Sequence, residues 1–373
     1  MKYDIIIVGA GILGLSHAYA AAQKGLHVLI CEKTDTPLGA SIRNFGFAVL
    51  SGQKEGEMLA LAKRSREIWN EWHQATNFHL FQNGSLLLAR NEIESDLLEA
   101  FMDRKARQYN YKSRLLSKAE IHSLYNGRFM QCPAILHGET DQVLYSREAI
   151  PTLVKELQTM SNITFQFSTL VKEIDSINGI AHTSRGDFKA DHFIICSGHD
   201  YQTLLAKEIA TLNPITCRLQ MLRVRPQDGL QLKHALLTGL STIHYGAYAN
   251  LEEAQAVFQQ IQQQNPEHLE NGIHLLVSPT PYGELIIGDS HHYQEFPTPF
   301  NNEEIDNMLL GLAEKTLGTK LTVIERWSGE YGAKGDESFT ILQPTENITA
   351  VLMRAGVGMS VGPALAEKVI ASI

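Results

Sequence analysis

The chain has 373 residues, of which 44% are hydrophobic and 20% are charged, and its formal net charge is −9. This length exceeds one ordinary domain but is short for three, and the composition is that of a globular protein with a full core. The negative charge argues against nucleic acid or an acidic membrane surface as the main partner, although a small anion could still bind in a local basic pocket.

The chain begins with an apolar run, "YDIIIVGAG", whose lack of alternation predicts a central parallel strand. A small-residue helix, "ILGLSHAYAAAQKG", and a second strand, "HVLICEK", follow it. Because the first strand is expected at residue 3 or 4, it leaves no room for a signal peptide, and no apolar run is long enough to span a bilayer. We therefore expect a soluble, cytoplasmic protein with no integral membrane segment.

A GxGxxG motif, Gly9-Ala-Gly11-Ile-Leu-Gly14, lies between this strand and helix, and Glu32 ends the second strand. The first glycine permits the tight turn, the second allows close approach of a pyrophosphate, and the third allows close packing of helix on strand. The helix N-terminus offers free N–H groups to phosphate, and the glutamate accepts hydrogen bonds from a ribose. This context favours a dinucleotide site over a ligand-free turn. The expected contacts are Gly9, Gly11, Ile12, Leu13, Gly14, Glu32 and Lys33.

The next segment is a charged helix in which Met58, Ala62, Ser65, Trp69 and Trp72 recur at helical spacing, as expected of a core-facing stripe. The sequence pattern then predicts strands at 78–90 and polar helices around 92–125. Between 146 and 198 it again predicts alternating helices and strands.

Residues 214–330 are predicted to form an antiparallel sheet with one or two helices, including strands at 217–226, 241–251, 272–280 and 283–293. The last 25 residues are expected to form a strand, a glycine turn and a helix. The predicted fold class is α/β: a Rossmann-like, three-layer nucleotide domain (1–78, 140–212 and 326–373) and an α+β domain built on an antiparallel sheet (79–139 and 213–325).

The four cysteines share no metal-like spacing and form no CxxC pair, so we expect buried free thiols and no metal site. They are Cys31, Cys132, Cys196 and Cys217.

The fingerprint, the "GAS" stretch after the glutamate, Val171 in a strand, the "ICSG" ending and the C-terminal GxG-x3-G resemble FAD-dependent oxidoreductases related to D-amino-acid oxidase, glycine oxidase and sarcosine oxidase. Within that superfamily, "ASIRNFG", "RLQMLR", "GDSHHY" and "GVGMSVGPALAE" resemble a bacterial branch associated with phosphonate breakdown. The resemblance implies FAD and oxidation of a small amine: a hydride passes from the amine carbon to flavin N5, and the imine is then hydrolysed. An electron acceptor, oxygen or another, is also implied.

The resemblance further implies which residues contact FAD. Ala40 and Ser41 would pass the pyrophosphate, and Arg43 and Asn44 would lie near the ring edge, where positive charge favours the anionic reduced flavin. A surface ion pair is the alternative for Arg43. The remaining implied contacts are Val171, Ser197, Gly198, Gly356, Gly358, Met359 and Ser360. Relatives can tether the flavin through a cysteine near the C-terminus or a histidine after the "GS" stretch. Here the last cysteine is Cys217 and Arg43 takes the histidine's place, so we expect non-covalent FAD.

Glycine- and sarcosine-oxidase-like chains commonly carry an arginine in a "WxGxR" segment, which can grip a substrate carboxylate. Here that segment is Trp327-Ser-Gly329-Glu-Tyr331, with tyrosine in the arginine's place. A phosphonate can instead be held by several donors, so an N-alkyl aminophosphonate is one expected substrate. We expect His291 and Tyr331 as catalytic residues and His244, Tyr245 and Arg326 as substrate-binding residues. Tyr248 and His292 are further candidate donors.

Two alternatives remain open at this point. The chain could be a glycine, sarcosine or D-amino-acid oxidase or dehydrogenase, or it could be a flavoprotein subunit whose catalysis depends on a partner. A plain NAD dehydrogenase is a third reading. For each histidine taken alone, a structural or solvated role is more common than a role in a site.

Overall fold

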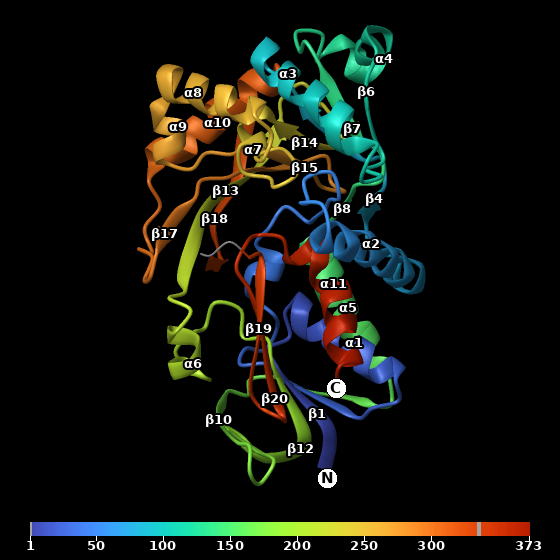
Figure 1. Cartoon of the computed structure of the whole chain (residues 1–373), viewed down its shortest axis with the longest axis vertical. Coiled ribbons are helices and arrows are strands. Elements are labelled where there is room, and N and C mark those ends of the chain that lie inside the picture. Colours follow the sequence, from blue (N-terminus) through green and yellow to red (C-terminus); the bar gives the residue numbers. More distant parts are fainter. Residues whose placement is uncertain (1, 334–336) are drawn as a thin grey trace.

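The computed structural model describes residues 2–333 and 337–373. It is elongated, with one sheet at each end and helices packed between and around them (Figure 1). The mixed α/β fold class predicted from the sequence is confirmed.

The first sheet has eight strands, and its centre is parallel. β1 pairs in parallel with β2 and β12, β2 with β9, and β12 with β20. β19 pairs with β20 as an antiparallel edge strand. β11 pairs with β12, and β10 pairs with β11, both antiparallel. The strands are β1 (Lys2–Val8), β2 (Val28–Cys31), β9 (Ile163–Gln166), β10 (Val171–Asp175), β11 (Ile180–Thr183), β12 (Gly186–Ile195), β19 (Phe339–Thr345) and β20 (Ile348–Met353).

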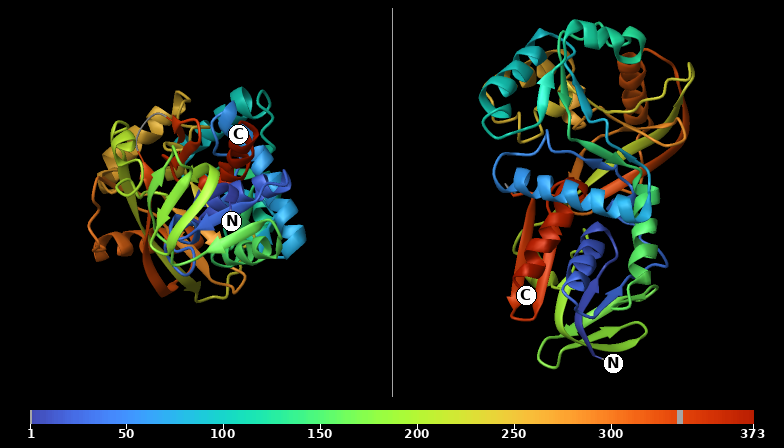
Figure 2. Two further views of the ribbon diagram at one scale, coloured as in Figure 1. Left: turned by 90° about the horizontal axis from the view of Figure 1, so that it is seen from below. Right: turned by 90° about the vertical axis from the view of Figure 1, so that its right-hand side faces the viewer.

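Helices α1 (Ile12–Gln23) and α5 (Ser146–Thr159) pack on this sheet. Helix α11 (Gly358–Ala371) packs on α1, and α2 (Glu57–Thr76) packs on α11 and α5. α1 and α11 lie close because their contact faces are small: a Cβ added to Gly362 would lie 3.2 Å from a Leu13 methyl. α2 crosses the middle of the molecule between the two sheets (Figure 2). Its buried residues include Ala62, Ser65, Trp69 and Trp72, as the helical spacing predicts.

The second sheet has nine strands in the order β17-β13-β16-β15-β14-β5-β7-β6, with β18 on the other edge of β13. All these pairings are antiparallel except that of β14 with β5. The strands are β5 (Ser85–Leu88), β6 (Ser113–Leu115), β7 (Ile135–Gly138), β13 (Ile215–Pro226), β14 (Ala235–Thr238), β15 (Leu276–Pro279), β16 (Leu285–Gly288), β17 (His292–Gln294) and β18 (Leu321–Ala333).

Helices α3 (Glu92–Phe101), α7 (Gly239–Thr242), α8 (Glu253–Gln264), α9 (Pro266–Glu270) and α10 (Glu303–Leu317) lie around the second sheet. A small sheet of β3 (Phe47–Ala48), β4 (Leu80–Phe81) and β8 (Gln142–Leu144) joins segments from three parts of the chain. The remaining elements are the short helices α4 (Lys118–Ser123) and α6 (Ala206–Ala210) and short helical turns.

The strand predicted at 241–251 is wrong. α7 ends at Thr242, and the chain continues in turns: the Tyr245 N–H donates to the Ser241 carbonyl at 3.1 Å, and the Tyr248 N–H to the Tyr245 carbonyl at 2.9 Å. The buried residues here are 239–242, 247, 248 and 251, which is not the alternation of a strand with one buried face.

The strand pairing also bears on the proposed division into domains. β18 pairs with β13 from Leu321 to Ala333, so the boundary placed at residue 326 falls inside one strand of the antiparallel sheet. The division into two domains stays a proposal, with this boundary moved past Ala333.

All four cysteines are free and buried. In the part of the chain that the structure describes, no helix is both long and apolar enough to cross a membrane.

Candidate functional site

The glycine motif forms a tight turn between β1 and α1. Gly9 has φ +99°, and a Cβ there would lie 2.5 Å from the Cys196 carbonyl oxygen. A Cβ on Gly14 would overlap the Gly9 carbonyl oxygen, which explains why only glycine lets α1 start so close to the strand. Ile12 and Leu13 are the first residues of α1, so their N–H groups lie at its positive end.

Glu32 and Ser41 flank the start of this helix. The Glu32 carboxylate accepts the Ala10 N–H at 2.9 Å and the Thr34 N–H at 3.1 Å, which fixes it at the end of β2. The Ser41 hydroxyl accepts the Ile12 N–H at 2.9 Å. Ala40 and Ser41 belong to a 3-10 turn, and a Cβ on Gly11 would lie 3.1 Å from the Ser41 hydroxyl.

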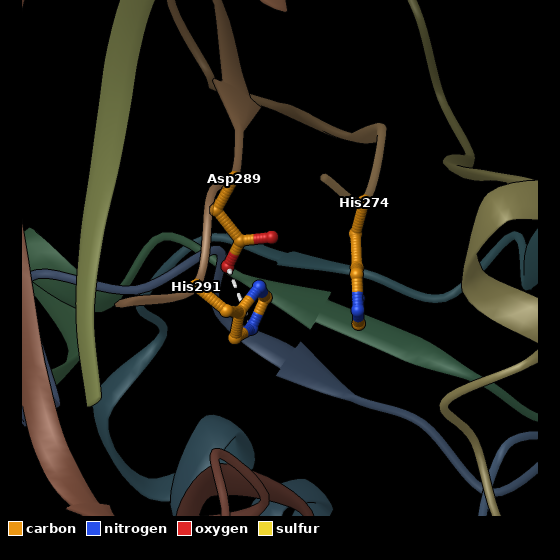
Figure 3. Close-up of side chains that lie close together, drawn as sticks. All are labelled: His274, Asp289 and His291. Atoms are coloured by element: carbon orange, nitrogen blue, oxygen red, sulfur yellow. Dashed lines mark ion pairs between the residues drawn. The ribbon is translucent and has the colours of Figure 1, made fainter. Parts of the chain in front are cut away.

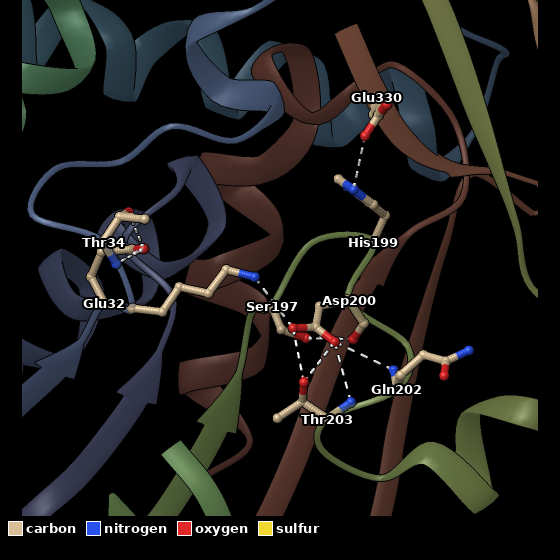
Figure 4. A network of polar contacts seen from close by, with 9 residues as sticks. Glu32, Thr34, Ser197, His199, Asp200, Gln202, Thr203 and Glu330 are labelled. Carbon is tan, nitrogen blue, oxygen red and sulfur yellow. Dashed lines mark hydrogen bonds and ion pairs between the residues drawn. The ribbon is translucent and has the colours of Figure 1, made fainter. Parts of the chain in front are cut away.

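The ends of β2 and β12 are connected by polar contacts, which Figure 4 shows. Lys33 forms an ion pair with Asp200 at 3.3 Å, just after Ser197 and Gly198, and Gly198 has φ +67°. Val171 is buried at the start of β10, two residues after Thr169, whose N–H donates to the Glu32 carbonyl at 2.8 Å. These predicted contacts therefore surround the carboxyl ends of β1, β2 and β12.

The C-terminal glycine turn reaches the same region from α11. Ser360 is buried, and its hydroxyl accepts the Val49 N–H at 3.1 Å and donates to the Phe47 carbonyl at 3.1 Å. The Met359 carbonyl accepts the Trp69 indole N–H at 2.8 Å. Gly358 begins α11, and a Cβ on Gly356 would lie 3.2 Å from the Tyr331 ring.

These residues fit FAD. The glycines let β1, α1 and the end of β12 pack too closely for any Cβ, and this brings the start of α1 to the carboxyl edge of the sheet between Glu32 and Ser41. The fingerprint residues would hold the adenosine and pyrophosphate, and the start of α11 offers a second positive helix end.

The loop from Arg43 to Gly46 runs from the nucleotide site to the second sheet. The Trp327 indole donates to the Arg43 carbonyl at 3.2 Å, and the Ser278 hydroxyl donates to the Phe45 carbonyl at 2.7 Å. The Asn44 amide donates to the Ala40 carbonyl at 2.8 Å and its oxygen accepts the Gly46 N–H at 2.6 Å, so this side chain shapes the loop itself. Among described residues, the Arg43 side chain has no hydrogen bond or ion pair.

Side chains of β18 alternate between two faces, and this separates two residues that the sequence placed in one site. Trp327, Gly329 and Tyr331 face the loop at Arg43 and the C-terminal glycine turn. Arg326 points to the other face, where its guanidinium pairs with Asp306 of α10 at 2.9 Å. Its role as a substrate-binding residue beside Tyr331 does not fit this geometry.

His292 and Tyr248 also lie apart from the site. His292 pairs across β17 and β13 with Arg218, on the face away from Tyr331, and its pKa is lowered by burial first and also by the Arg218 guanidinium. Tyr248 packs on Phe101 with ring centroids 4.7 Å apart.

His244, Tyr245 and His291 come together with residues that the sequence did not single out. The rings of His244 and His274 have centroids 3.8 Å apart, and those of His274 and His291 are 4.3 Å apart. A Cβ on Gly52 would lie 2.7 Å from the Tyr245 ring, so glycine makes room for this tyrosine. We call this group the histidine–tyrosine cluster: His244, Tyr245, His274, Asp289, His291 and Tyr331.

His274 and Asp289 were missed because their proximity depends on the register of one hairpin. The His274 N–H donates to the Asp289 carbonyl at 2.9 Å, and the Asp289 N–H donates back at 2.7 Å, which extends the β15–β16 ladder. The "GDSHH" segment did contain a signal for Asp289: this aspartate stands two residues before the predicted His291, a spacing that puts both on one face of an extended chain.

Burial sets the protonation of this cluster. Desolvation, with the nearby charge of His291, lowers the pKa of the buried His274 well below its usual value, and it lowers the pKa of His244 less because that residue is exposed. Desolvation raises the pKa of Asp289 to about 6, partly offset by His291. Burial also raises the pKa values of Tyr245 and Tyr331, and the charge of Asp289 contributes to both. Near neutral pH, His274 is therefore neutral, Asp289 is mostly ionised and the two tyrosines are protonated.

His274, Asp289 and His291 have ligand-type atoms within 4.8 Å of one another. Two imidazoles and a carboxylate are a set that transition metals accept, although the sequence predicted no metal site.

The comparisons with known proteins agree with the geometry. The model of the FAD dependent oxidoreductase family matches residues 4–372. Over 211 residues the chain is 27% identical to monomeric sarcosine oxidase of Bacillus sp. (strain B-0618), covering 55% of this chain and 53% of that protein. It is 24% identical over 221 residues to N-methyl-L-tryptophan oxidase of Yersinia pestis (strain Pestoides F), covering 58% and 57%. The aligned region thus spans about half the length of these curated relatives.

Solved structures share the fold along the whole chain. Glycine oxidase from Geobacillus kaustophilus has a TM-score of 0.78 at 18% identity, covering 100% of this chain and 94% of that one. The FAD-bound L-alpha-glycerophosphate oxidase from Mycoplasma pneumoniae has a TM-score of 0.76 at 21% identity, covering 100% and 95%. With a family model that matches almost every residue and a fold that positions the fingerprint for FAD, the chain belongs to the FAD-dependent oxidoreductase family.

Proposed function

We propose that this enzyme oxidises a small secondary amine that carries a phosphonate group. FAD, when bound, accepts a hydride from the carbon beside the amine nitrogen. The protein must hold the two ends of the substrate so that this carbon meets the flavin, and it must do so without the carboxylate-binding arginine of related chains.

The observation that carries the proposal is the histidine–tyrosine cluster. The three imidazoles lie ring against ring, and Tyr245 and Tyr331 lie near enough to Asp289 for its charge to raise their pKa values, so several potential donors lie in one region. Among described residues, the charged neighbours that shift the pKa of Tyr245 and Asp289 include no Arg or Lys. A carboxylate is best held by one bidentate arginine, whereas the three oxygens of a phosphonate suit several separate donors.

The cluster also has a polarity that fits a zwitterion. Asp289 lies at the His291 end, and the His244 ring is 6.4 Å from the His291 ring, with His274 between them. An ammonium group would be favoured near the carboxylate, and an anion would be favoured near His244 and His274. A bound anion raises the pKa of a nearby imidazole and so favours its protonated form. FAD-dependent oxidation of glycine or sarcosine is the second candidate, favoured by the names of the relatives.

The test is anaerobic bleaching of the purified yellow protein. We expect N-alkyl aminophosphonates to reduce the flavin faster than glycine, sarcosine or D-amino acids at equal concentration. Faster bleaching by sarcosine than by its phosphonate counterpart would favour the second candidate. A protein that no amine bleaches would instead point to a subunit that depends on a partner.

A further inference from the structure

Asp289 has a buried carboxylate with an incomplete set of partners. Its side chain is 5% exposed. Among residues 2–333 and 337–373, its Oδ1 atom has no hydrogen-bond partner. Leaving a buried acceptor unpaired is costly, and more so when it is charged, so a donor is expected to complete this position.

His291 is not that donor. Its Nδ1 lies 2.8 Å from the Gly272 carbonyl oxygen, which can only accept, so Nδ1 carries the proton. Its Nε2 lies 3.8 Å from Asp289 Oδ2, beyond hydrogen-bond distance, and Oδ1 meets no donor among the described residues. Figure 3 shows these two side chains on one segment, with His274 beside them. Oδ1, the other oxygen of this carboxylate, is therefore left for a donor from outside the described residues, such as the N–H of a bound ammonium group beside His291.

We infer that Asp289 and His291 form the amine subsite: they hold the substrate nitrogen as a secondary ammonium, and Asp289 takes one of its protons. This inference rests on the proposed function. In the proton transfer, one N–H bond breaks and one O–H bond forms on Asp289, and the electron pair stays on nitrogen. Nitrogen needs that free pair before the neighbouring carbon can lose a hydride.

Burial makes this proton transfer less unfavourable than it would be in water. An aliphatic amine has a pKa near about 10 in water, well above that of a carboxyl group. Burial raises the pKa of Asp289 to about 6 and lowers that of any ammonium placed beside it, which narrows the difference. The transfer also converts a buried ion pair into two neutral groups.

The groups around Asp289 come from its own segment and from five other parts of the chain. They are His291 on its own segment, His274 before β15, Tyr245 and His244 after α7, Cys217 of β13, Tyr293 of β17 and Tyr331 of β18. At neutral pH burial keeps the thiol and the phenols protonated, so the proton acceptors are Asp289 and the imidazoles. Transfer to Asp289 leaves two neutral groups, whereas transfer to an imidazole would leave a buried cation, which favours Asp289 as the base.

The main experiment is the pH profile of flavin reduction under nitrogen, for the holoenzyme and for Asp289→Asn. With Asp289 as base, the second-order rate constant of the wild type should rise through about pH 6 and level off. In Asp289→Asn it should fall by about 100-fold or more near neutral pH, the usual size of a lost general base. It should then rise about tenfold per pH unit toward pH 10, as free amine becomes available. Asp306→Asn, a buried carboxyl on the other face of β13, is the matched control and should keep the wild-type profile shape.

A second measurement uses binding without turnover. The holoenzyme is first reduced with dithionite, and the dissociation constants of the amine and of its thioether analogue, which has sulfur in place of the N–H group, are measured under nitrogen. Asp289→Asn should weaken amine binding by about tenfold or more and leave thioether binding nearly unchanged, as expected for one charged hydrogen bond.

Three results would overturn the inference. They are a wild-type profile that keeps rising to the pKa of the free amine, an equal effect of Asp289→Asn on amine and thioether, or one equivalent of metal in purified wild type that EDTA removes and Asp289→Asn lacks. If no amine reduces the wild type at any pH, the proposed function fails, which is a different outcome from these three.

Discussion

Tyr331→Phe isolates the hydroxyl that stands where related chains carry an arginine. The ring contacts the backbone at Gly356, and phenylalanine keeps that packing. Burial holds the pKa of the Tyr331 hydroxyl well above its usual value, so it acts as a neutral donor throughout the working range. The free energy of unfolding should therefore change by less than about 1 kcal/mol.

The effect on substrate can be worked out from the same contacts. A hydrogen bond to a charged group contributes about 1.5–3 kcal/mol, which corresponds to about 10- to 150-fold in affinity. Because Tyr245 and the histidines would share the anion, we expect the lower end of this range, about tenfold, in the substrate concentration for half-maximal bleaching. The limiting rate should change by less than about threefold if the hydroxyl binds ground and transition states alike.

The assay is anaerobic stopped-flow reduction over a range of substrate concentrations, with Tyr282→Phe as a control because Tyr282 is exposed. An unchanged half-saturating concentration, or a fall confined to the limiting rate, would show that Tyr331 does not hold the substrate.

Three further predictions follow from the cofactor site and the core. FAD should be non-covalent, so acid precipitation should release all the yellow colour, whereas colour in the pellet would contradict this. Gly14→Ala should purify without FAD because its Cβ would overlap the Gly9 carbonyl, while Gly311→Ala, with open space around it, should stay yellow; retained colour in Gly14→Ala would refute the fit. Burial lowers the pKa of His17 to about 4, so the unfolded state binds more protons between about pH 4 and 6.5, and stability falls as pH drops through that range. We expect the free energy of unfolding of His17→Leu, measured in urea and taken relative to that of the wild type, to increase by about 2 kcal/mol when the pH is lowered from about 7.5 to 5. No increase would mean that His17 titrates normally.

The nucleotide-binding half could be predicted because the features that define it lie close together in the sequence. A tight glycine turn, a helix start and a ribose acceptor lie within 24 residues of sequence from Gly9 to Glu32, and each constrains the chain by itself. The core stripe of α2 was readable for the same reason, since helical periodicity needs no partner to be recognised.

The substrate half depends on tertiary pairing, which the sequence does not display. His274 meets Asp289 only through the β15–β16 register, and Arg326 turns away from Tyr331 because neighbours in a strand point to opposite faces. The segment 241–251 mixes polar and apolar residues in a way that suits both a strand and buried turns, and packing decides between them.

The central claim, a flavin enzyme that anchors a phosphonate on the histidine–tyrosine cluster, is tested most directly by one matched pair of substrates. Sarcosine and its phosphonate counterpart differ only in the acid group, so the ratio of their second-order rate constants for anaerobic flavin reduction reports the anchor alone. The account predicts a ratio of about 10 or more in favour of the phosphonate, as expected for one charged hydrogen bond gained. A ratio at or below one would contradict it and assign the chain to amino-acid oxidation.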